Sequence, residues 1–148
     1  MTIQERLMEA MKEAMKAKDA PRLSAIRMMR TAIKNREIDS RQELSAQEAI
    51  GVLSTLVKQR RESAEAYHQG GREDLAAQEE RELAVIQEFL PSQLGEAELK
   101  EIIEAAVAET GAASLKDLGK VMKVVTPRTV GRADGRVVSE LVKARLAG

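Results

Sequence analysis

The 148-residue sequence contains no cysteine and no tryptophan, and it has one histidine (His68), one tyrosine (Tyr67) and one phenylalanine (Phe89). The lack of cysteine excludes disulfides and thiolate metal sites. One histidine is too few for a histidine-based metal site, and it is the only base that a Ser-His-acid triad could use. The scarcity of aromatic residues removes the stacking platforms that bind single-stranded nucleic acid. The core must therefore be aliphatic.

Long apolar runs are also missing. No run approaches the length that spans a membrane, and the first residues, which include Thr2, Gln4, Glu5 and Arg6, do not form a signal peptide. The absence of cysteine fits a reducing compartment. We therefore expect a soluble, cytoplasmic protein with no membrane partner.

Charge is balanced in total but not along the chain. The 24 basic and 24 acidic residues give a net charge of zero. Residues 1–72 carry a net charge of +4, residues 73–113 carry −9, and residues 114–148 carry +5. An acidic middle and a basic end give the molecule a directional field.

Apolar residues recur at helical spacing throughout, and no segment alternates with period two, so the predicted fold is all-α. Thr2 with Glu5 and Ser45 with Glu48 are capping-box signals for helix starts. Expected helix ends are Gly70-Gly71, Pro91, Gly111 and Pro127, with a loop at 128–135. The predicted apolar face of the first helix is Ile3, Leu7, Met11 and Met15, with Met8 beside it, and Arg60 interrupts the stripe of the third helix.

The best candidate for a domain junction is the segment 90–95, around Pro91. It predicts an N-terminal bundle of about four helices over residues 1–91. A smaller, basic domain of three helices follows over residues 92–148.

A search for catalytic chemistry finds little. His68 lies near an expected helix end, where a solvated or capping role is typical. The acidic cluster Glu79, Glu80, Glu82 and Glu88 is typical of a solvated helix face rather than a cation site. Gly119-Lys120 lacks the preceding glycine of a P-loop. We predict no catalytic residue, no metal ligand, no cofactor and no stand-alone enzymatic activity.

The basic C-terminal region gives the most specific signal. Lys116, Lys120 and Lys123 are spaced i, i+4 and i+7, so one helix would present them on one face. Arg128, Arg132 and Arg136 follow, with glycines between them that would let a ligand approach the backbone. This pattern fits either a solvated surface or a phosphate footprint on structured RNA. A weaker basic group is Lys58, Arg60 and Arg61.

Several motifs together resemble the YqeY-like family, over essentially the whole chain. They are Leu23-Ser24-Ala25-Ile26-Arg27, Lys58-Gln59-Arg60-Arg61-Glu62-Ser63, Gly71-Arg72-Glu73-Asp74-Leu75, Phe89-Leu90-Pro91-Ser92-Gln93-Leu94, Gly119-Lys120-Val121-Met122-Lys123 and Gly131-Arg132-Ala133-Asp134-Gly135-Arg136. That family is related to the tail of the GatB subunit of glutamine-dependent aminoacyl-tRNA amidotransferase. The resemblance implies a helical bundle joined to a three-helix domain. It also implies that this tail-like domain helps to hold tRNA, while the amidotransferase chemistry belongs to modules that have no counterpart here.

Two functional expectations follow. The first is a nonenzymatic module that binds tRNA or a tRNA-protein complex. Its candidate contacts are Lys116, Gly119, Lys120, Lys123, Arg128, Arg132 and Arg136, with Lys120 and Lys123 implied by the resemblance and the arginines added from their charge. The alternative is an adaptor that docks an amidotransferase subunit or another protein. Its adaptable apolar surface would be formed by Met8, Met11, Met15, Met28 and Met29.

Overall fold

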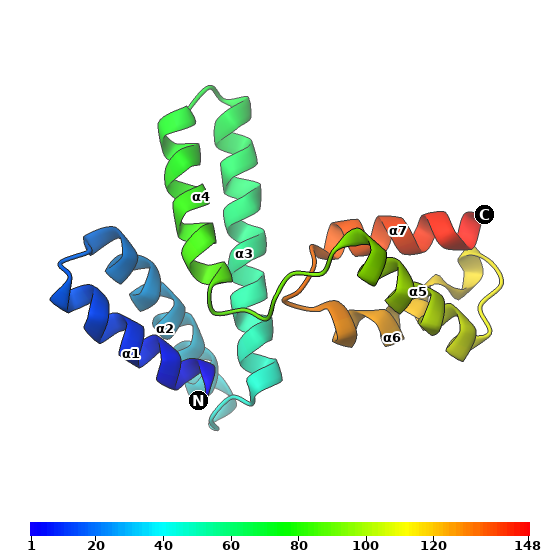
Figure 1. Ribbon diagram of the computed structural model, residues 1–148, viewed down its shortest axis with the longest axis horizontal. Coiled ribbons are helices and arrows are strands. Elements are labelled where there is room, and N and C mark those ends of the chain that lie inside the picture. Colours follow the sequence, from blue (N-terminus) through cyan, green and yellow to red (C-terminus); the bar gives the residue numbers. More distant parts are fainter. The chain divides into compact units, whose positions relative to one another are not determined.

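The computed structural model describes residues 1–148 and contains seven α-helices, one short 3₁₀ turn and no strand (Figure 1). The predicted all-α class is confirmed. The chain divides into two compact units, Met1–Pro91 (unit 1) and Ser92–Gly148 (unit 2). Unit 1 holds α1 (Ile3–Lys16), α2 (Ala20–Ser40), α3 (Ala46–Gln69) and α4 (Glu73–Gln87). Unit 2 holds α5 (Glu96–Thr110), η1 (Leu115–Asp117), α6 (Leu118–Thr129) and α7 (Gly135–Ala147).

Side chains that cap the backbone fix most of the helix boundaries. The Thr2 hydroxyl accepts the Glu5 amide at 3.1 Å, and Ser45 and Glu48 form a reciprocal capping box with two bonds of 3.2 Å. These bonds satisfy amide groups that the first helical turn leaves without partners. Gly111 ends α5 in the left-handed conformation, with a φ of 67° that glycine adopts without strain.

Unit 1 is built from two helical hairpins, α1–α2 and α3–α4, which Figure 1 shows as antiparallel pairs. Every helix of unit 1 contributes at least one large, fully buried side chain to its core. These side chains are Leu7, Ile26, Met29, Leu53 and Ile86. Each such aliphatic side chain contributes roughly 1.5–3 kcal/mol when it leaves water.

The face of α1 that packs inward differs from the prediction. Ala10 and Ala14 are buried with Ile3 and Leu7, whereas Met11 is half-buried and Met15 is 51% exposed. Spacings of four, three and four residues keep these four positions on one helical stripe. Hydrophobicity alone favoured the longer methionines, of which only Met11 packs partly against the core.

Arg60, which interrupts the apolar stripe of α3, binds acidic residues of α4. Its Nε atom lies 2.8 Å from Oε2 of Glu82 and 3.4 Å from Oε2 of Glu79, and its guanidinium also contacts the sulfur of Met28 in α2. The Arg60 side chain is only 19% exposed. The sequence predicted a solvated face for the acidic cluster. Part of this cluster instead pairs with a half-buried arginine.

Unit 2 packs α5, α6 and α7 around a core of branched aliphatic residues, chiefly Leu99, Ile103, Val121, Val125, Val138 and Val142. Pro127 does not end α6 as predicted, because the helix continues to Thr129 and the loop covers only residues 130–134. Proline removes the amide that would donate to the Lys123 carbonyl, so the last turn depends on other bonds. The buried Thr129 hydroxyl donates to the Val125 carbonyl at 3.1 Å, and the Val130 amide donates to the Thr126 carbonyl at 2.9 Å, which holds the last turn closed. None of the helices combines the length and the apolar character needed to cross a lipid bilayer.

Candidate nucleic-acid interface

The outward side of α6 presents Gly119, Lys120 and Lys123, which we call the α6 basic surface. All three residues are exposed, while Val121 and Val125 on the inward side are fully buried. A turn of 3.6 residues places Gly119 and Lys123 one above the other, with Lys120 beside them. The helix therefore sorts its apolar residues to the core and its lysines to solvent.

Lys116 does not lie on the same helix as the other two lysines, so this part of the prediction is wrong. It belongs to η1, because Ser114 caps this short turn and not α6. The Asp117 carboxylate completes the cap by accepting the Ala113 amide at 2.9 Å and the Ser114 amide at 3.4 Å. These bonds, with the one from Ala113 dominant, lower the pKa of Asp117 and keep it ionised. Lys116 is exposed just before α6 begins.

The ammonium groups of the α6 basic surface are largely unpaired. The Lys120 Nζ atom lies 3.9 Å from an Asp117 carboxylate oxygen, and the Lys120 side chain is 69% exposed. An ion pair this long and this solvated contributes little. Neither Lys116 nor Lys123 forms an ion pair. These three cations are thus available to an external anion.

The three predicted arginines differ in their surroundings. The Arg128 Nη2 atom lies 3.0 Å from both carboxylate oxygens of Glu109 in α5, so this charge is already neutralised. Arg132 donates from Nε to the Ser92 carbonyl at 3.1 Å, and its own carbonyl accepts the Leu94 amide at 2.7 Å. These bonds give Arg132 a structural role at the start of unit 2.

Arg136 is the remaining arginine of the predicted set. It is exposed in the first turn of α7, where its amide donates to the Asp134 carboxylate at 2.9 Å, and its guanidinium forms no ion pair. Of the seven residues predicted to contact nucleic acid, Arg128 and Arg132 are engaged within unit 2, while the other five are exposed.

Unit 2 is not a basic domain overall, although its sequence end is basic. It contains nine basic and eight acidic side chains, because the acidic helix α5 belongs to the same unit. Two ion pairs connect α5 to its neighbours, Glu109 to Arg128 of α6 and Glu104 to Arg145 of α7. The glutamates of α5 therefore neutralise Arg128 and Arg145, whereas the lysines of the α6 basic surface are not paired with α5.

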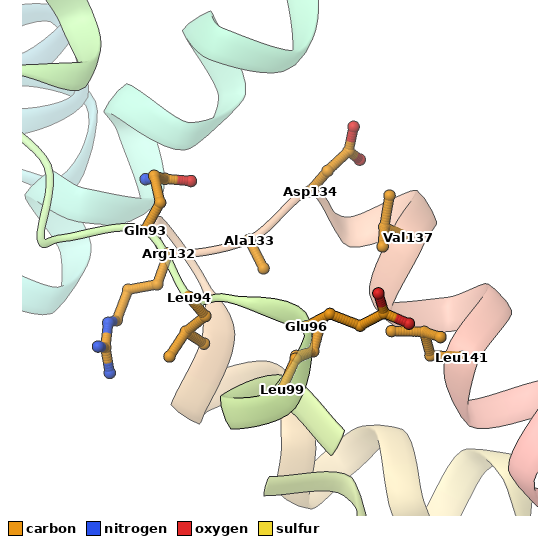
Figure 2. A pocket seen from close by; sticks show the side chains of 9 residues that line it. All are labelled: Gln93, Leu94, Glu96, Leu99, Arg132, Ala133, Asp134, Val137 and Leu141. Atoms are coloured by element: carbon orange, nitrogen blue, oxygen red, sulfur yellow. The ribbon is translucent and has the colours of Figure 1, made fainter. Parts of the chain in front are cut away.

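A shallow pocket of about 410 Å³ also lies within unit 2 and was not anticipated from the sequence. Figure 2 shows Gln93 and Arg132 at one end, and Asp134, Val137 and Leu141 toward the other. Val137, near the start of α7, is 45% exposed at this pocket. The lining contains no serine, threonine or histidine, so it offers no hydroxyl nucleophile with a histidine base.

His68, the single histidine, links the two ends of the α3–α4 hairpin turn. Its Nδ1 atom lies 2.5 Å from a Glu73 carboxylate oxygen, and its Nε2 atom lies 2.7 Å from one of Glu80. The hydrogen bond to Glu80, followed by that to Glu73, raises the pKa of His68. The His68 side chain is exposed, as the sequence predicted. Its two hydrogen bonds connect α3 to α4 and act as a clamp on the turn between them.

The family model described as Yqey-like protein matches residues 4–146. Several curated proteins are also similar, each named Altered inheritance of mitochondria protein 41, mitochondrial. The protein from Vanderwaltozyma polyspora is 41% identical over 87 residues, which are 58% of this chain and 47% of that protein. The protein from Eremothecium gossypii is 40% identical over 85 residues, which are 57% of this chain and 46% of that protein. The protein from Saccharomyces cerevisiae is 35% identical over 81 residues, which are 54% of this chain and 44% of that protein.

The chain matches about half the length of these curated relatives. Their names place them in mitochondria, which contradicts the cytoplasmic location expected from the sequence. That expectation was wrong because cysteine content and hydropathy limit redox chemistry and membrane insertion but do not specify a compartment.

Proposed function

The chain belongs to the Yqey-like proteins, and from this premise we propose that unit 2 binds the phosphate backbone of folded RNA, specifically tRNA, as a noncatalytic module. The contacts are the α6 basic surface, with Lys116 and Arg136 at its margins. The relation of this family to the tail of an amidotransferase subunit supports tRNA as the RNA class.

The observation that carries the proposal is the pair Gly119 and Lys120 in the first turn of α6. Glycine inside a helix costs about 1 kcal/mol relative to alanine, yet a Cβ atom at Gly119 would meet nothing within 4 Å. A lysine in the first turn opposes the positive end of the helix dipole, an effect of about 0.3–1 kcal/mol. Folding gains little from either residue, because the ion pair of Lys120 with Asp117 is long and solvated. Both suit an anion that approaches the backbone closely.

The chemistry of this surface favours phosphate over bases. Lysines neutralise phosphate charge without reading sequence, and backbone contacts of this kind position the ligand. Unit 2 has no aromatic residue that could stack on a base. Folded RNA, which presents its backbone in a fixed shape, is therefore the ligand class that these side chains fit.

The test is tRNA binding at salt concentrations from 50 to 200 mM, with the parent chain and the variant Lys120→Gln/Lys123→Gln. Removing two phosphate contacts should lower the log–log salt slope by about 2 and weaken binding roughly tenfold at the lower salt. The matched control is Lys100→Gln/Lys143→Gln, which removes the same charge from exposed positions of α5 and α7. Equal slopes for the parent and the α6 variant would exclude this surface.

One observation favours the alternative function of a protein adaptor. Met8 and Met15, seven residues apart on α1, are both exposed, whereas Met29 is buried and Met11 and Met28 are half-buried. Only the first two could thus supply a flexible apolar contact. Under this alternative, an amidotransferase subunit should bind the nuclease-treated parent chain but not Met8→Ser/Met15→Ser.

A further inference from the structure

The outward face of α2 in unit 1 carries a row of cations that the sequence analysis did not identify. Arg27, Lys34 and Arg41 are spaced by seven residues, or about two helical turns, so they lie on one side of the helix. All three are exposed, and the buried residues of α2, which are Ala25, Ile26, Met29 and Ile33, occupy the other side. We call Arg27, Lys34 and Arg41 the α2 basic stripe.

No carboxylate neutralises this stripe. None of its three residues forms an ion pair, although Glu88, just after α4, pairs with Arg22 near the start of α2, and α4 itself pairs with Arg60 of α3. Asp19 caps the start of α2, and Glu37 accepts the Leu44 amide at 3.0 Å. Asp39, the other acidic residue of α2, is exposed and forms no ion pair with the stripe. Unit 1 thus pairs the half-buried Arg22 and Arg60 with carboxylates and leaves this exposed row open.

The composition of the stripe indicates the class of partner. Protein interfaces have an apolar centre, and membrane-surface helices have a broad apolar side, but the only exposed apolar side chain in this row is Ile38. The row extends over about 21 Å along the helix axis and is rich in arginine, which binds phosphate through two donors at once. A continuous phosphate backbone matches this length and charge.

Arg41 supplies a second indication. It occupies the left-handed backbone conformation at the end of α2, with φ 58°, where glycine would be unstrained. The long cationic side chain is therefore retained in a conformation that disfavours it. Part of this cost is offset because a cation is favourable at the C-terminus of a helix.

From the charge, spacing and exposure of these residues, we infer that the α2 basic stripe is a second phosphate-binding surface for folded RNA, located in unit 1. This inference goes beyond the proposed function, because the stripe would bind RNA whether or not the α6 basic surface does.

The experiment compares tRNA binding by four full-length chains over a range of salt concentrations. They are the parent, the stripe variant Arg27→Gln/Lys34→Gln/Arg41→Gln, the α6 variant Lys120→Gln/Lys123→Gln, and the control Lys12→Gln/Lys16→Gln/Arg81→Gln. The control removes three exposed cations from α1 and α4 that form no ion pairs. We expect the stripe variant to lose about 2 to 3 from the log–log salt slope and at least tenfold in affinity at 100 mM salt, with the control unchanged.

A stripe variant that binds tRNA with the parental slope would overturn the inference, and the α6 variant reports on the proposed function independently. Arg41→Gly guards against misfolding, because it should weaken tRNA binding while it keeps or raises the thermal midpoint. The same four chains are mixed with polyglutamate and with phosphatidylserine vesicles. If the stripe is needed for either of these but not for tRNA, the partner is an acidic protein or a membrane and the inference is wrong.

Discussion

The Nη2 atom of Arg128 in α6 lies 3.0 Å from both carboxylate oxygens of Glu109 in α5. This contact joins the C-terminal ends of two consecutive α-helices. It also removes one predicted cation from the surface available to RNA, which gives the first prediction.

Arg128→Gln should change tRNA affinity by less than about twofold, and it should cost no more than about 1 kcal/mol of unfolding free energy because both side chains are close to half exposed. Glu109→Gln should instead strengthen tRNA binding, since it frees the guanidinium. Filter binding and urea unfolding of both variants provide the measurement. A large affinity loss in Arg128→Gln with normal stability would show that Arg128 contacts RNA despite its partner.

Gly119→Ala should raise the unfolding free energy of unit 2 by about 0.5–1 kcal/mol, because the added methyl group enters open space and alanine favours the helix. The same change should weaken tRNA binding if phosphate approaches the α6 backbone. Thermal unfolding and binding are measured on one preparation. An increase in stability without any loss of affinity would mean that no ligand comes close to Gly119.

Arg60→Ala should destabilise unit 1 by about 1–3 kcal/mol, since it leaves Glu79 and Glu82 without their shared cation in a half-buried site. One carboxylate oxygen of Glu79 is already buried without a hydrogen bond, which makes the loss more costly. Urea unfolding checks the value. Arg81→Ala, on the exposed side of α4, should stay within about 0.5 kcal/mol of the parent.

The clamp formed by His68 should make the α3–α4 turn sensitive to pH. Its pKa is raised in the folded state by Glu80 and Glu73, so its stabilising contribution is complete below the ordinary value of 6.5 and disappears as pH rises through the folded value. Unfolding by urea at pH 6 and pH 9 should show a lower midpoint at the higher pH, by a small amount because the group is exposed.

The control for this pH effect is His68→Gln, which cannot titrate. The difference between the two midpoints should shrink in this variant, because any remaining difference comes from other groups. An unchanged difference would show that the histidine clamp does not contribute to the pH dependence of stability.

Particular residues show how far the sequence could predict the fold. The all-α class and the helix starts at Thr2 and Ser45 follow from local rules, since capping and helical periodicity involve residues three or four positions apart. The early end predicted for α6 was wrong, because Pro127 removes only one backbone hydrogen bond and the helix continues past it to Thr129. The buried hydroxyl of Thr129 then closes the last turn.

The candidate site was less predictable for a similar reason. Lys120 and Lys123 share a face because they belong to one helix, and spacing is enough to place them together. Lys116 was misplaced, since the bond between Ser114 and Asp117 forms a separate 3₁₀ turn. The residues of the α2 basic stripe are visible in the sequence. The stripe was nevertheless missed, because their exposure and lack of partners depend on how α2 packs.

The sequence by itself determined the helices and the sides on which they are apolar, because hydrogen bonds and side-chain contacts within a helix connect near neighbours along the chain. Tertiary structure alone decided which charges stay free. Whether Arg128 meets Glu109, or Arg60 meets Glu82, depends on how two separate helices pack against each other, which the spacing within one helix does not specify. The surfaces offered to an anion are those that remain once these pairs have formed.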